Sequence, residues 1–94
     1  MIQTTTLEMD QAERMMKALC NHFARKITAH YEDNIGFIDF GNGTCELTAA
    51  PNELRLHVKA DNAEGLEHVK KVVISHLMRF MSLEELPVTW VESE

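Results

Sequence analysis

The stretch Gly36-Phe37-Ile38-Asp39-Phe40-Gly41-Asn42-Gly43-Thr44-Cys45-Glu46-Leu47 has the pattern of two strands joined by a tight turn. Gly and Asn tolerate positive φ, so residues 41–43 predict a hairpin between strands at 35–40 and 44–49. Regular alternation along both strands turns every second side chain toward one face. The side chains that this pattern assigns to the core are Ile38, Phe40, Cys45 and Leu47.

Other segments carry the same kind of signal. Residues 53–60 show the clearest strand pattern, because apolar and polar residues alternate along their whole length. Such alternation is typical of a sheet with one buried and one solvated face. Further strands are predicted at residues 2–7, which are rich in β-branched side chains, and at 27–31. Residues 88–91, which follow Pro87, form either a short edge strand or an ordered tail.

Two helices are predicted between these strands. Each begins with an Asp that has a Glu three residues later, the spacing of a capping box: Asp10 with Glu13, and Asp61 with Glu64. Behind each cap, apolar side chains recur at helical spacing. The two stripes consist of Ala12, Met15, Met16, Leu19, Cys20 and Phe23, and of Leu66, Val69, Val73, His76, Leu77 and Phe80.

These elements together predict an α+β fold with two layers. Two helices with one apolar stripe each, and an antiparallel meander with one apolar face, bury those surfaces most simply against each other. We therefore expect both helices on one face of a four- or five-stranded antiparallel sheet. A chain of 94 residues supports one hydrophobic core, so residues 1–94 are expected to form a single domain.

The charge of the chain argues against nucleic acids and membranes as partners. The net charge is −6, shared about equally between residues 1–47 and 48–94. Proteins that bind a phosphate backbone use clustered Lys and Arg, whereas the basic pairs here, Arg25-Lys26 and Lys70-Lys71, are too short to follow one. An anionic membrane surface is disfavoured for the same reason, and no apolar run is long enough to span a bilayer.

The two cysteines, Cys20 and Cys45, are too few for a disulfide framework and form no Cys-x-x-Cys pair. The first residues lack the basic region and apolar run of a signal peptide. We therefore expect a cytoplasmic protein with reduced thiols.

Cys20, His22 and Cys45 are the candidate metal ligands, because thiolates and imidazoles bind transition metals. Against this, both cysteines fall on apolar sides of their elements, where free thiols are usually buried and structural. Residues two apart on a helix also point in different directions. Cys20 and His22 can therefore bind one metal only if the helix ends between them.

Three other residues are candidates for a functional role. Asp39 is predicted to stabilise the turn or to lie on the surface. Arg79 is predicted to pair with Glu84 or Glu85, an exposed contact worth at most about 1 kcal/mol. His76 interrupts an apolar stripe, so our hypothesis is a buried, neutral histidine whose protonation in acid costs stability, with a ligand or switch role as the alternative. An unchanged acid-unfolding midpoint in His76→Phe would count against it.

No catalytic constellation is present in the sequence. The Walker loop, the dinucleotide Gly fingerprint, the nucleophile elbow and the zincin motif are all absent. No acid, base and nucleophile stand at a defensible spacing. We therefore predict no catalytic residues and no cofactor, and do not expect an enzyme that acts alone.

Three stretches together carry a resemblance to a known family. They are Leu19-Cys20-Asn21-His22-Phe23-Ala24-Arg25-Lys26, then Gly36-Phe37-Ile38-Asp39-Phe40 with Gly43-Thr44-Cys45-Glu46-Leu47, and then His76-Leu77-Met78-Arg79-Phe80 with Glu84-Glu85-Leu86 and Trp90. In this order and spacing the chain resembles the bacterial family called domain of unknown function 2218. The family often has a basic residue or His where Asn21 and Arg25 stand here, which weakens the case for a His-rich site on the first helix.

The resemblance implies a fold similar to the half-repeat of the TATA-binding protein, in the order β-α-β4-α, which agrees with the pattern above. It implies no established activity. It also implies an association with iron acquisition, because similar domains occur attached to or near flavin-dependent siderophore-interacting reductases. Fold analogy alone does not establish function.

Two functions remain after these exclusions. The first is a non-catalytic accessory or protein-interaction module that meets a protein partner, or itself as a homodimer, through the solvated sheet face or the helices. The alternative is a domain that binds a small ligand or a metal, such as iron or a siderophore. DNA binding, suggested by the fold name only, is disfavoured by the net charge of −6.

Overall fold

Six strands and two helices make up the computed structural model, which describes residues 1–93. In chain order they are β1 (Ile2–Glu8), α1 (Ala12–Phe23), β2 (Thr28–Glu32), β3 (Ile35–Asp39), β4 (Thr44–Ala50), β5 (Glu53–Lys59), α2 (Ala63–Phe80) and β6 (Val91–Glu92). The predicted order of strand, helix, four strands and helix is confirmed, with β6 added at the end.

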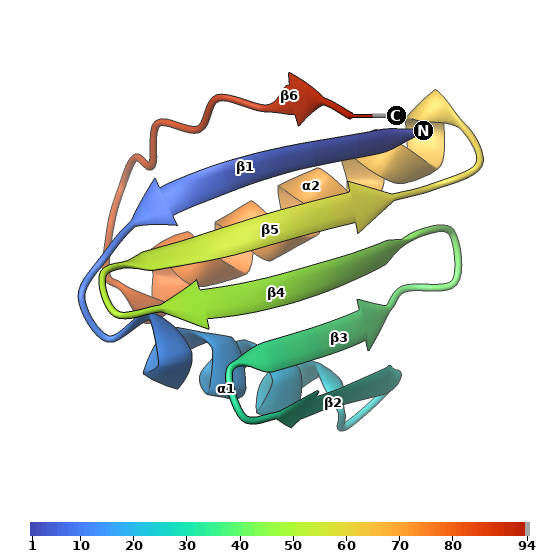
Figure 1. Cartoon of the computed structure of the whole chain (residues 1–94). Helices are drawn as coiled ribbons and strands as arrows, with labels where there is room; N and C mark the ends of the chain where they lie inside the picture. Colours follow the sequence, from blue (N-terminus) through green and yellow to red (C-terminus); the bar gives the residue numbers. More distant parts are fainter. Residues whose placement is uncertain (94) are drawn as a thin grey trace.

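The strands form one antiparallel sheet in the order β2-β3-β4-β5-β1-β6 (Figure 1). The sheet has six strands rather than the predicted four or five, because β6 pairs with residues 3–4 of β1. Of the two forms expected for residues 88–91, a short edge strand or an ordered tail, the strand is present, but it is two residues long and lies at Val91–Glu92. Val91 and Glu92 are the residues paired with β1, and the N–H of Ser93 also donates to the carbonyl of Ile2 at 2.9 Å.

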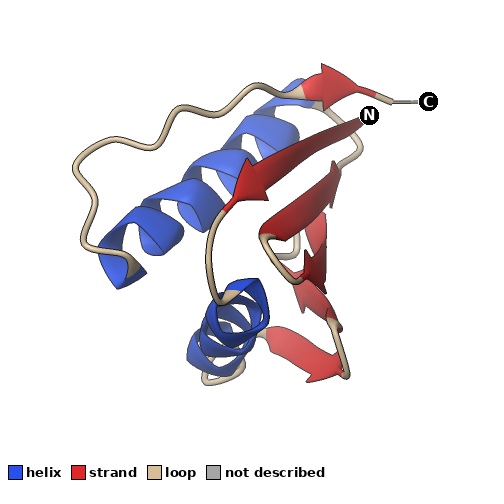
Figure 2. Ribbon diagram, turned by 60° about the vertical axis from the view of Figure 1, so that its left-hand side comes forward, coloured by secondary structure: helices blue, strands red, loops and turns tan. Residues whose placement is uncertain are grey.

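Both helices pack on the same face of the sheet, and the opposite face carries no helix in residues 1–93 (Figure 2). α1 lies under β2, β3, β4 and β5, and α2 lies beside α1. Between these layers the largest fully buried side chains are Met16, Leu19, Ile38, Leu47, Leu54, Leu56, Leu77, Val58, Val69, Val73, Cys20 and Cys45. Burying a Leu, Ile or Val side chain contributes about 1.5–3 kcal/mol, so this layer is the main source of stability.

Both predicted helix caps are wrong by one residue. The residue before α1 is Gln11, which has a left-handed backbone (φ 57°) and makes no side-chain capping bond. The cap of α2 is Asn62, whose Oδ1 accepts a hydrogen bond from the backbone N–H of Gly65 at 2.8 Å. Asn62 has the extended backbone that a cap requires, whereas Asp61 stands one residue too far from the helix.

The turn between β3 and β4 is stabilised by a hydrogen bond within it and by helix α2, which packs on it. The N–H of Phe40 donates to the carbonyl of Gly43 at 2.9 Å, and Gly41 takes the positive φ (90°) that the turn requires. A Cβ at Gly43 would lie 2.9 Å from Cγ2 of Val69, so α2 packs directly on this turn. The close approach of α2 therefore explains why residue 43 is a glycine, although its backbone angles do not require one.

The segment after α2 returns along the helix to the edge of the sheet. The chain turns at Ser82 (φ 56°), and Leu86, Val88 and Trp90 pack against the core from outside. The hydroxyl of Thr5 donates to the carbonyl of Thr89 at 2.8 Å, which fixes this segment beside β1. Neither α1 nor α2 combines the length and the hydropathy that a membrane-crossing helix requires.

Candidate functional site

Four rings from the two helices meet where the end of α1 crosses α2. His22 lies 5.0 Å from His76 and 5.7 Å from Phe80, measured between ring centroids. Phe23 lies 4.8 Å from His76. His76 and Phe80 are four residues apart, so they share one side of α2 and can both face the end of α1. The sequence could not predict this contact, because it depends on how the two helices are placed on the sheet.

A pocket of about 610 Å³ opens beside these rings. Its size lies in the range of small-molecule sites. The lining comes from the end of α1, the residues that follow it, the end of the β3 region and the outer side of α2. The lining residues are His22, Phe23, Arg25, Lys26, Ile27, Phe40, His68, Val72 and His76.

The floor of the pocket is apolar. Phe23 and Phe40 meet edge to face, with ring centroids 5.1 Å apart and planes at 74°. Both rings are half-buried, as are Ile27 and Val72 beside them. Phe40 was predicted as a core residue, and it does pack against the core, but one side of its ring remains open to the pocket. An apolar ligand body would find here a preformed surface.

The rim of the pocket is basic and has no carboxylate. Arg25 and Lys26 line it with three histidines, and no Asp or Glu belongs to the lining. The pKa of His22 is lowered, first because it is partly removed from water, and then because His76, Arg25 and Arg79 add positive charge near it. The side chains thus produce a positive potential without an internal counter-charge, which favours an anion at this place.

His76 is half-buried and hydrogen-bonded rather than fully buried as the hypothesis required. Its Nδ1 lies 2.8 Å from the carbonyl oxygen of Val72, and a carbonyl can only accept, so Nδ1 carries a proton. In the neutral ring, Nε2 is then an acceptor. The other histidine of α2 that lines the pocket, His68, has its Nδ1 3.1 Å from the side-chain amide nitrogen of Asn42.

The three candidate metal ligands do not come together. Cys20 and Cys45 are free thiols buried in the core, whereas His22 is exposed on another side of α1. Burial raises the pKa of both thiols, and the proximity of Cys20 raises that of Cys45 further. Within residues 1–93 no three His, Cys, Asp or Glu side chains are arranged to hold a metal ion.

Asp39 acts on its own turn. Its Oδ1 accepts a hydrogen bond from the N–H of Gly41 at 2.9 Å. The residue also lines a second hollow, of about 430 Å³, at the end of the sheet. Lys59 and Asp61 line that hollow too, so it has mixed charge and no distinct preference for a ligand.

Arg79 makes no ion pair with Glu84 or Glu85 in the described part of the chain, so the predicted contact is wrong. Helix α2 ends at Phe80 and the chain turns at Ser82, between Arg79 and the two glutamates. Arg79 instead lies near enough to His22 to lower its pKa.

One signal in the sequence could have revealed the pocket. Residues 14–31 and 68–83 contain no Asp or Glu, although the chain has fifteen. The same two stretches contain seven of the nine Lys and Arg residues. They include most of both helices, and the fold brings them together at the pocket. Net charge counted by halves of the chain conceals this.

Comparison with known proteins gives a family and a fold. The family model described as "Uncharacterized protein conserved in bacteria (DUF2218)" matches residues 4–91. No curated protein matches the chain. The NMR structure of PA4090 from Pseudomonas aeruginosa is similar, with 31% sequence identity and a TM-score of 0.86 over 99% of this chain and 97% of that one.

Proposed function

Since this chain belongs to the DUF2218 family of uncharacterized bacterial proteins, we propose a function from its own geometry: it is a non-catalytic accessory module that binds a small organic anion. The ligand occupies the pocket between the end of α1 and α2. One observation carries the proposal, namely five basic side chains and no carboxylate around a pocket in a protein of net charge −6.

The two parts of the pocket define the ligand. Arg25 and Lys26 can donate charge-assisted hydrogen bonds to a carboxylate, sulfonate or phosphate group. Phe23 and Phe40 offer their open sides to an aromatic or branched apolar body. We therefore expect an anionic head and an apolar body in one molecule, rather than a simple inorganic ion.

The lining supports binding rather than catalysis. It contains no Ser, Thr, Cys, Asp or Glu, so it offers no side-chain nucleophile apart from histidine and lysine and no carboxylate to orient a histidine. The proton on Nδ1 of His76 is already held by the carbonyl of Val72. The remaining nitrogen can accept one hydrogen bond from a ligand.

The link to iron acquisition enters the proposal only through the family resemblance. A ferric catecholate siderophore combines negative charge with aromatic rings, so it belongs among the anions to be tested. Ferrous iron and zinc alone are not expected to bind through Cys20, His22 and Cys45. We also propose a cytoplasmic location, because both cysteines are free thiols.

Titration of isotope-labelled protein with 2-naphthoate, followed by amide and aromatic NMR shifts, tests the proposal. The uncharged 2-naphthamide is the matched ligand control. We expect naphthoate to shift resonances of Phe23, Phe40 and His76 and to bind more tightly than the amide. A ferric catecholate and a ferric hydroxamate, run in the same way, test the siderophore link.

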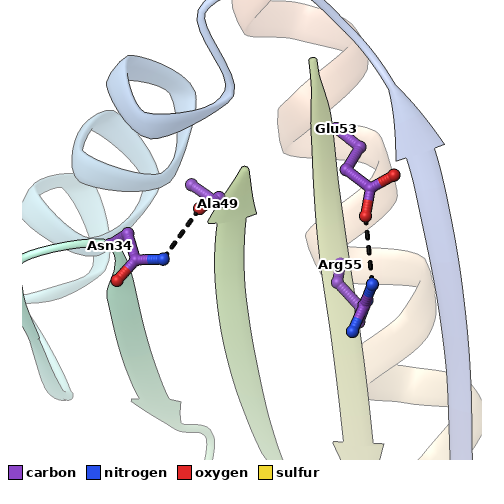
Figure 3. Close-up of polar contacts among 4 residues, drawn as sticks. All are labelled: Asn34, Ala49, Glu53 and Arg55. Atoms are coloured by element: carbon purple, nitrogen blue, oxygen red, sulfur yellow. Dashed lines mark hydrogen bonds and ion pairs between the residues drawn. The ribbon is translucent and has the colours of Figure 1, made fainter. Parts of the chain in front are cut away.

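The matched variants change charge inside and outside the pocket. The double variant Arg25→Gln/Lys26→Gln should weaken naphthoate binding by about tenfold or more, because each charge-assisted hydrogen bond is worth about 1.5 kcal/mol or more. Arg55→Gln should not, since Arg55 lies on β5 and pairs with Glu53 at 3.1 Å (Figure 3). Equal binding of the charged and uncharged ligands, or shifts away from the pocket, would refute the proposal.

A second role is suggested by the uncovered face of the sheet. It is the one large surface of regular structure without a helix in residues 1–93 (Figure 2), and we propose that a protein partner or another copy meets the molecule there or at the border of the sheet. The family resemblance implies a fold like that of the TATA-binding protein, but we do not propose that this chain binds DNA. Asp39, Glu46 and Glu53 alternate with Lys59 and Arg55 on this face, which does not suit phosphates.

A further inference from the structure

The two borders of the sheet differ. On one side β6 covers β1 over two residues only, and on the other side β2 leaves five residues, Thr28–Glu32, with no strand beyond them (Figure 1). Alternate residues of such a border strand direct N–H and C=O groups outward, where another strand can pair with them. β2 is therefore the longer open border of the sheet.

β2 lacks most of the features that usually protect a border strand, and its one charged side chain, Glu32, stands at its end. It contains no Lys and no Pro, and its pairing with β3 runs without a bulge from Thr28 to Glu32. The hairpin that contains it also exposes apolar surface, because Tyr31 is 37% and Ile35 is 56% exposed. An unprotected strand beside exposed apolar side chains is a surface suited to strand addition.

The hairpin is held in place before any partner arrives. In the turn between β2 and β3, the side-chain amide of Asn34 donates to the carbonyl of Ala49 at 2.9 Å (Figure 3). The N–H of Ala49 donates in return to the carbonyl of Asn34 at 2.8 Å. Since β4 lies in the interior of the sheet, these bonds fix the acidic end of the hairpin. A partner would then lose little conformational entropy on ordering this hairpin.

The charges around β2 indicate which partner fits. Arg25 and Lys26 precede the strand, and Glu32 and Asp33 end it, so the segment is basic at its start and acidic at its end. We propose that a second copy of this chain pairs with β2 in antiparallel orientation, His30 opposite His30, which joins the two sheets into one. The inference deepens the second role proposed above, and it shares Arg25 and Lys26 with the lining of the anion pocket.

The antiparallel arrangement satisfies the charges of both copies at once. With His30 on the two-fold axis, Thr28 faces Glu32 of the second copy, and Ala29 faces its Tyr31. The basic Arg25-Lys26 segment of each copy then comes beside Glu32 and Asp33 of the other, so the favourable contact occurs twice. Isologous pairing of this kind is the commonest symmetry of homodimers. A peptide that is not acidic at one end and basic at the other would leave the charge at one end of β2 unpaired.

Sedimentation velocity over a concentration series, with light scattering as a second measure of mass, tests the inference. Wild type should show a monomer–dimer equilibrium. Glu32→Lys and Lys26→Glu should each weaken dimerisation by about tenfold, because a like-charge contact is created twice by symmetry. The exchange variant Lys26→Glu/Glu32→Lys should restore the dimer. Glu46→Lys, the same charge change on β4 inside the sheet, should leave it unaffected.

Several outcomes would overturn the inference. They are a wild-type monomer at every concentration, equal effects of Glu32→Lys and Glu46→Lys, and an exchange variant that stays monomeric. Amide shifts on dilution should concentrate in residues 28–32, and shifts centred on residues 91–92 would point to the wrong border. Neither Glu32 nor Glu46 lines the anion pocket, so naphthoate binding in these variants separates failure of this inference from failure of the proposed ligand site.

Discussion

The thiol of Cys45 lies in the middle of β4 with 0% of the residue exposed. On the neighbouring strands it faces Ile38 and Val58. Burial raises its pKa, and the nearby Cys20 and Glu46 add to the rise. Alternation along residues 44–49 was enough to predict this position, because strand periodicity alone decides which face a side chain takes.

We expect the buried thiol to make the native state less stable at alkaline pH. Above about pH 8.5 the thiol ionises in the unfolded chain but stays protonated in the folded chain, so only the unfolded state gains from ionisation. For Cys45 the free energy of unfolding should fall by about 1.4 kcal/mol per pH unit in this range. Urea denaturation at a series of pH values from neutral to alkaline measures the slope.

Cys45→Ala is the control for that slope. The variant should be less stable than wild type at neutral pH, because the lost sulfur leaves a cavity. Its stability should fall less steeply at alkaline pH, since one of the two buried thiols is gone. Parallel slopes for the two proteins would show that Cys45 does not cause the pH dependence.

His22 marks the limit of this kind of reasoning at the level of a residue. Helical spacing correctly separated it from Cys20. Nothing in the spacing indicated that it would face His76, because residues of two helices meet only when both are placed on the sheet. The hydrophobic periodicity of one helix does not show which side chains of another helix its residues will contact.

Among the elements, α2 illustrates how one side chain decides where a helix begins. Asn62 and Asp61 are adjacent, and both residue types make good caps, but only Asn62 bonds to the N–H of Gly65. The position is further constrained because a Cβ at Gly65 would collide with the carbonyl oxygen of Asn42 in the hairpin turn. The first turn of α2 is thus placed by a long-range contact that sequence spacing does not contain.

Asn62→Ala should therefore destabilise the protein by about 0.5–2 kcal/mol, the usual cost of losing a cap. Asp61→Ala, which removes the residue that the capping-box spacing favoured, should change the free energy of unfolding by less than about 0.5 kcal/mol. Denaturant unfolding of both variants against wild type makes the comparison. If Asp61→Ala proves the more costly, the cap assignment is wrong.

The strands were more predictable than the helix ends. Alternation predicted the bounds of β3, β4 and β5 to within one residue, because each has one face on the core and one in solvent. β6 was placed too early because a two-residue strand has no periodicity to read. Its position depends on where the segment after α2 reaches β1, which the bond between Thr5 and Thr89 reflects.

At the scale of the whole molecule, positive and negative side chains are separated in the folded structure although they are mixed evenly between the two halves of the sequence. The two halves of the sequence carry about equal negative charge, which gave no indication of a binding site. Most of the Lys and Arg residues belong to the two acid-free stretches, 14–31 and 68–83, and two of them, Arg25 and Lys26, line the pocket together with three histidines. A net charge of −6 therefore coexists with a surface that favours anions.

The proposed anion should bind more tightly at acidic than at neutral pH, because protonation of His22 adds a positive charge beside the pocket. The pKa of His22 is lowered first by its partial removal from water and then by the positive groups near it, and a bound anion would offset the second effect. By linkage, an anion that stabilises the protonated His22 ring must itself bind more tightly when that ring is protonated. Calorimetric titration with 2-naphthoate at several pH values should show an increase of about threefold to tenfold in affinity.

His22→Gln should remove part of this pH dependence, whereas His57→Gln should leave it intact. His57 lies on β5 between Thr4 and Glu46, outside the pocket. The site would need another explanation if affinity rose with pH, or if the two variants behaved alike.

The position of β1 inside the sheet has a consequence for how the protein is made. β1 precedes the other five strands in the sequence and is synthesised before them, yet its backbone partners are residues 53–59 and 91–92. No ladder bond of β1 can form until β5 has been synthesised. β2 to β5, in contrast, pair with their neighbours in sequence and need only short loops to do so. The nascent meander can thus assemble while β1 is still unpaired, so the first of the six strands to be synthesised is among the last to join the sheet.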